Sequence, residues 1–73
     1  MLTPSEQQKL MGIFQILKPP IVIKLLEDNL MELSVSGHHP VKMPRRMFRE
    51  MDAFDILDKI GVSEDERKYS RPE

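Results

Sequence analysis

Hydrophobic residues recur at helical spacing near the start of the chain, between residues typical of helix ends. Thr3 and Glu6 form a Thr-x-x-Glu capping box, and Pro4 suits the first helical position. Two prolines at 19 and 20 end the helix at about Lys18. Gly12, inside the helix, suggests close packing there. We expect one apolar face made of Leu10, Ile13, Phe14 and Leu17.

The pattern then changes to that of β-strands. Residues 21–26 are rich in β-branched side chains, residues 27–29 have turn chemistry, and residues 30–35 alternate between apolar and polar. This predicts a β-hairpin. Residues 41–43, flanked by prolines, suit a short third strand at a sheet edge.

A second helix is predicted over residues 44–60, ended by Gly61. Its apolar residues fall on two stripes rather than one, so either the helix kinks near Asp52 or it is buried on two sides. The first stripe consists of Met47, Met51 and Phe54. The second consists of Ala53, Ile56, Leu57 and Ile60.

These elements predict an α+β fold with the order helix, β-hairpin, helix and a possible short third strand. Residues 1–61 form a single small binding domain. Residues 62–73 are almost entirely polar and form a flexible tail, although Ser63-x-x-Glu66 is able to cap one helical turn.

Composition limits the possible functions. With 73 residues, the chain builds only a thin core, which argues against an enclosed substrate cavity and against an enzyme. It has no cysteine, no apolar run long enough to span a bilayer and no signal-peptide pattern, so we expect a cytoplasmic protein. No glycine-rich phosphate loop is present, and we expect no cofactor.

Charge is nearly balanced overall, at −1, but it is unevenly distributed. A basic segment is followed by three aspartates at intervals of three residues, and both are candidate partner-binding regions. The candidate residues are His38, His39, Lys42, Arg45, Arg46, Arg49, Asp52, Asp55 and Asp58.

Each of these groups also has an ordinary interpretation. The two adjacent histidines have no third ligand at a usual spacing, so solvated loop histidines are favoured over a metal site. The aspartates form one ridge on a helix, which suits a solvated face or a docking ridge but not paired-carboxylate catalysis. The arginines begin the predicted helix and the aspartates lie towards its end, which opposes the helix dipole and hints at a role in binding.

Nucleic acid is the alternative partner for the basic segment 38–49. Against it, the sequence has no helix-turn-helix pattern and no run of aromatic residues for base stacking, since its three phenylalanines look like core. Four methionines, at positions 31, 43, 47 and 51, suit an irregular core or an adaptable binding surface.

The chain resembles the small RNA polymerase-binding transcription regulators of Xanthomonas bacteriophages. The resemblance lies in the total length, the opening MLTPSEQQKLMGIF, the lack of cysteine and the segment VKMPRRMFREMDAFDILDKIG. It implies a non-enzymatic, monomeric protein in the bacterial host cytoplasm. Such a protein binds host RNA polymerase, inhibits initiation and also allows read-through of terminators. The resemblance implies no active site and assigns no contact residues.

Overall fold

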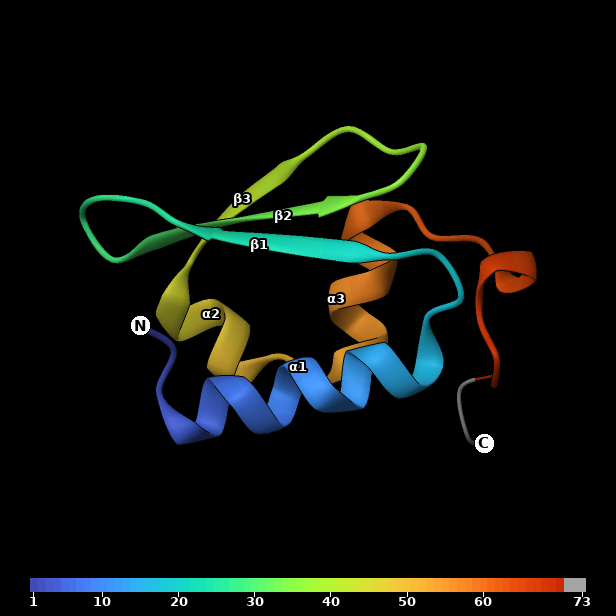
Figure 1. The fold of residues 1–73 in the computed structure, drawn as a ribbon, viewed down its shortest axis with the longest axis horizontal. Helices are drawn as coiled ribbons and strands as arrows, with labels where there is room; N and C mark the ends of the chain where they lie inside the picture. Colours follow the sequence, from blue (N-terminus) through green and yellow to red (C-terminus); the bar gives the residue numbers. More distant parts are fainter. Residues whose placement is uncertain (71–73) are drawn as a thin grey trace.

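A computed structural model describes residues 1–70, which form an α+β domain of two layers. One layer is a three-stranded antiparallel sheet in the order β1-β2-β3, and the other consists of three helices that cover one face of the sheet (Figure 1). The strands are β1 (Ile21–Leu25), β2 (Leu30–Val35) and β3 (Val41–Pro44). The helices are α1 (Pro4–Ile16), α2 (Arg45–Glu50) and α3 (Ala53–Ile60). The predicted hairpin and the predicted third strand are both confirmed.

The β1–β2 turn fixes the register of the hairpin. Asp28 and Asn29 both adopt φ of 60°, the left-handed conformation that suits a tight hairpin turn and that Asn and Asp tolerate better than most residues. Leu25 then pairs with Met31 across the two strands. This register sends Met31, Leu33 and Val35 to the helices, while the residues between them lie on the open face.

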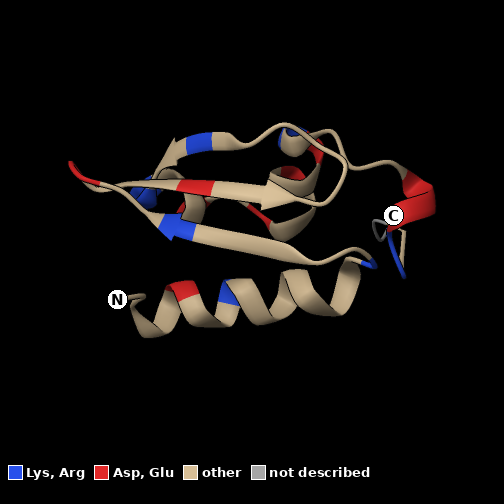
Figure 2. Cartoon of the chain, turned by 45° about the horizontal axis from the view of Figure 1, so that its top comes forward, with Lys and Arg blue, Asp and Glu red and all other residues tan. Residues whose placement is uncertain are grey.

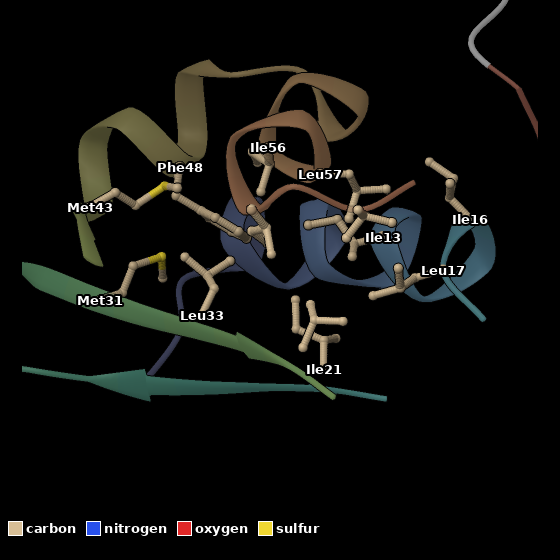
Figure 3. Packing of buried hydrophobic residues seen from close by; sticks show 13 residues of the cluster. Ile13, Ile16, Leu17, Ile21, Met31, Leu33, Met43, Phe48, Ile56 and Leu57 are labelled. Atoms are coloured by element: carbon tan, nitrogen blue, oxygen red, sulfur yellow. The ribbon is translucent and has the colours of Figure 1, made fainter. Parts of the chain in front are cut away.

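The core lies between the sheet and the helices, and all three helices contribute to it (Figure 3). Its fully buried side chains interlock across the two layers. They are Ile13 from α1, Met31 and Leu33 from β2, Met43 from β3, Phe48 from α2, and Ile56 and Leu57 from α3. The opposite face of the sheet has a row of cross-strand charges, with Glu32 of β2 between Lys24 of β1 and Lys42 of β3 (Figure 2).

The first helix ends at Ile16, two residues before the predicted end, because Leu17 already has an extended backbone. The predicted apolar face is also partly wrong. Phe14 is 48% exposed, and Ile16 is buried in its place. Alanine in place of Gly12 would meet no atom within 4 Å, so close packing does not explain this glycine.

The helix predicted over residues 44–60 is two helices. Met51 and Asp52 both have extended backbones between α2 and α3, and Asp52 accepts a 2.9 Å hydrogen bond from the backbone N–H of Phe54. The break separates the two apolar stripes. Helix α3 turns Ile56, Leu57 and Ile60 of the second stripe towards the core, whereas α2 buries Phe48 and leaves Met47 of the first stripe 39% exposed. Lys9 of α1 donates a hydrogen bond to the backbone oxygen of Met51 and holds the junction against α1.

The segment after Gly61 packs against the domain as far as Arg67, which differs from the flexible tail predicted there. Val62 and Arg67 are buried, and residues 64–66 form one 3-10 turn with the capping box that Ser63 and Glu66 predict. Leu17 and Arg67 form an antiparallel bridge. Residues 71–73 of the predicted tail lie outside the described residues.

Candidate binding surface

One carboxylate, that of Glu6, contacts two of the predicted arginines, Arg45 and Arg49. Its side chain is fully buried near the start of α1, where it accepts a 2.8 Å hydrogen bond from the backbone N–H of Thr3 as part of the capping box. The same carboxylate accepts hydrogen bonds from Arg45 Nε at 2.9 Å and Arg45 Nη2 at 2.6 Å. A weaker contact of 3.3 Å comes from Arg49 Nη1.

These contacts change the titration of the pair. The hydrogen bonds from Arg45 outweigh the effect of burial and lower the pKa of Glu6 from 4.5 to about 2. The same carboxylate raises the pKa of Arg45. Glu6 is therefore a charged group inside the domain at neutral pH, and it holds the start of α2 against the start of α1.

The arrangement corrects two predictions about the arginines. The position of the arginines at the helix start suggested a role in binding, yet Arg45 compensates a buried charge within the fold. The conflict with the helix dipole is also reduced, although Arg45 and Arg46 still stand in the first turn of α2. Because the predicted helix is broken, Asp52 and Asp55 stand at the start of α3, Lys59 stands in its last turn and Arg49 stands in the last turn of α2, which are favourable positions.

Two adjoining hollows lie beside α2. The first has a volume of about 540 Å³ and lies between the β1–β2 turn, Thr3 and the three arginines Arg45, Arg46 and Arg49. The second, of about 340 Å³, is mostly apolar. It is lined by Pro44, Arg46, Met47, Glu50 and Met51. Pro44 and Arg46 border both hollows, so the two lie next to each other, and together they are here called the α2 groove.

The α2 groove brings together only some of the predicted basic residues. Arg45, Arg46 and Arg49 line it, whereas His38, His39 and Lys42 do not. Lys42 lies on the open face of the sheet opposite Glu32. Arg46 contacts Glu50, four residues further along the same helix, at 3.3 Å between Nε and Oε1.

The two histidines, adjacent in sequence, have different surroundings. His39 is exposed, whereas His38 is half-buried, and its Nε2 atom lies 2.9 and 2.8 Å from the two carboxylate oxygens of Glu66. This contact lowers the pKa of Glu66. It also connects the β2–β3 loop to the C-terminal segment, which corrects the prediction that both histidines are merely solvated.

The three aspartates do not act as one ridge. Asp52 caps α3, and Asp58 Oδ1 forms a 2.6 Å ion pair with the buried Arg67. Asp55 is exposed within the first turn of α3. Asp52 and Asp58 thus have structural roles in the fold.

Sequence reasoning assigned Glu6 and Glu66 only to capping boxes and gave Arg67 no role, so it missed the ion pairs that these three residues form. A signal for Glu6 was present. It precedes Leu10 by four residues and Ile13 by seven, so it continues the core-facing stripe of α1. No comparable spacing identifies Arg67, because its partners come from a different element and a turn.

Comparison with known proteins yields no match, since no family model, no curated protein and no solved structure is similar to this chain. Within residues 1–70, no helix is both long and apolar enough to cross a membrane. The same residues contain no group of three or more histidine or carboxylate side chains able to hold a metal ion.

Proposed function

We propose that this chain is a non-enzymatic cytoplasmic regulator that binds bacterial RNA polymerase, lowers transcription initiation and promotes read-through of terminators. The proposal rests on the resemblance in sequence. The observation that supports it best is that Pro44, Arg46, Met47 and Met51, which line the apolar part of the α2 groove, all belong to the segment that carries the resemblance.

The chemistry of this surface suits a protein partner. Met47 is 39% exposed beside the 81% exposed side chain of Arg46. Methionine adapts to different apolar shapes, and arginine is enriched where proteins meet. A surface of this kind supports a binding role better than a catalytic one.

A pull-down from bacterial lysate followed by transcription in vitro tests the proposal. The chain is expected to retain the polymerase subunits and to reduce run-off transcript from a host promoter with purified polymerase. It is also expected to increase the transcript that passes a terminator. Abundant bait without polymerase, together with unchanged transcription, would refute the proposal.

The alternative is a direct nucleic-acid binder that uses residues 38–49. It is less well supported, because Arg45 and Arg49 contact Glu6 and Lys42 lies on a different face from the α2 groove. A shift of duplex DNA by the chain alone, at sub-micromolar concentration and physiological salt, would favour this alternative.

A further inference from the structure

The two parts of the α2 groove differ in chemistry and share a border. Three arginines line one part, and Met47 and Met51 line the other. Arg46 lies between them, with most of its side chain exposed. An occupant of the whole groove therefore needs an acidic group beside an apolar one.

Hydrogen-bond donors remain in the arginine part. A guanidinium carries five N–H donors. Among the described contacts, Arg46 gives one to Glu50 and Arg49 gives one to Glu6. Both side chains thus have capacity for a carboxylate ligand.

Glu6 makes this part of the groove rigid before any ligand arrives. It holds Arg45 by two short hydrogen bonds, and it contacts Arg49. Side chains that are already held in place lose less conformational entropy on binding. Glu6 also neutralises part of the positive charge, so that the remaining attraction favours one or two acidic groups rather than a long polyanion.

We propose that the α2 groove binds a short segment of a partner protein that has an acidic residue next to a large apolar residue. The carboxylate contacts Arg46 and Arg49, and the apolar side chain packs on Met47 and Met51. This proposal makes the proposed function more specific. It depends on that function only for the assumption that the partner is a protein.

Three observations favour such a segment over a nucleic acid. Glu50 lines the apolar part, and Asp28 lines the arginine part, where both would repel a phosphate chain. The exposed aromatic residues Phe14 and Tyr69 belong to neither lining, so the described part of the groove offers no stacking platform for bases. A continuous phosphate backbone also has no apolar group that could pack on Met47 and Met51.

Selection of short random-sequence peptides against the intact chain tests the proposal. The selected peptides are expected to be enriched in Asp or Glu next to Leu, Met or Phe. Their affinity is then measured for Arg46→Glu, for Met47→Ser and for Lys59→Glu, which makes the same charge change on α3, outside the groove. Arg45 stays unchanged because it compensates Glu6. Each groove variant should lose about tenfold or more in affinity, and the control should lose little.

Thermal unfolding of each variant separates a lost contact from a lost fold. If one groove variant unfolds, the other carries the test, and amide chemical shifts in the parent chain map the bound peptide to residues 44–51. The proposal is overturned if selection yields no acidic–apolar peptide, or if such peptides bind both folded groove variants as tightly as the parent. It is also overturned if single-stranded DNA displaces the peptides, or if a dimer of the chain buries the groove.

The two proposals fail in different ways. If selected peptides bind the groove but no polymerase is recovered, the groove inference stands and the proposed function fails. If the polymerase binds the folded Arg46→Glu and Met47→Ser variants as well as the parent, the function stands and the groove inference fails.

Discussion

Glu6 and Arg45 form a bidentate ion pair in which the glutamate side chain is fully buried and the arginine side chain is 19% exposed. The residues are 39 positions apart, and the pair joins the first turn of α1 to the first turn of α2. Loss of one partner would leave a buried charge without compensation, which is costly in a domain of this size.

Substitution Glu6→Gln tests this pair. Glutamine keeps the shape of the side chain but removes the charge, so Arg45 loses its compensation. We expect the free energy of unfolding to fall by about 2 kcal/mol, as is typical of hydrogen bonds to charged groups. Urea denaturation measures the change. Glu50→Gln, which weakens the exposed pair with Arg46, is the control and should cost about 0.5 kcal/mol or less. Equal effects of the two substitutions would argue against a special role for Glu6.

Stability should also decrease in acid. The pKa of Glu6 is about 2 in the folded chain and 4.5 in its ordinary state, so the folded state favours the ionised form. This contribution is therefore fully present above about pH 4.5, and it is lost as the pH falls towards 2. The lowered pKa of Glu66 acts in the same direction.

Denaturation midpoints at several pH values between neutrality and pH 2 measure this loss. The Glu6→Gln variant should show a shallower decrease than the parent, because the titrating group is gone. Glu66→Gln provides a separate comparison and isolates the share of the second carboxylate. An acid decrease that is identical in the parent and in Glu6→Gln would contradict the assignment.

The elements themselves were largely predictable from sequence, because local patterns determine them. The capping box of Thr3 and Glu6 and the turn at Asp28 and Asn29 act over a few residues, and both form as expected. The two apolar stripes already indicated an irregularity near Asp52. The sequence left open whether the helix kinks there or is buried on two sides, because the choice depends on packing against the rest of the fold.

The candidate surface was predicted less well, because charge partners distant in sequence determine it. In sequence, nothing distinguishes Arg45 from Arg46 and Arg49. In the structure, Arg45 forms an ion pair with the buried Glu6, whereas the side chain of Arg46 is exposed. Likewise, nothing in the local pattern distinguishes His38 from His39. Only the packing of the C-terminal segment brings Glu66 to one and not to the other.

This difference between the histidines predicts the behaviour of the C-terminal segment. His38→Ala removes the side-chain link to Glu66, so the contacts next to Glu66 should open more often. The amide of Lys18 donates to the Glu66 carbonyl at 2.8 Å and should exchange its hydrogen faster. Hydrogen exchange followed by NMR measures this rate. The matched control is His39→Ala, whose side chain is exposed, and it should leave the rate unchanged. Equal acceleration in both variants would indicate a general effect of the loop.

Two glycines in helical surroundings should respond in opposite ways to alanine. Gly12 lies inside α1, and a methyl group there would meet no atom within 4 Å. Alanine restricts the unfolded chain and favours the helix, so Gly12→Ala should raise the free energy of unfolding by about 1 kcal/mol. Gly61 ends α3 with φ of 96°, and it donates from its backbone N–H to the oxygens of Leu57 and Asp58.

Alanine at Gly61 must adopt that left-handed conformation, so Gly61→Ala should lower the free energy of unfolding by about 1 kcal/mol. Urea denaturation of the two variants side by side measures both changes, and each serves as the control for the other. The same substitution thus distinguishes Gly12, where a methyl group has space, from Gly61, where the left-handed backbone favours glycine. Destabilisation by Gly12→Ala would contradict the open space around this position.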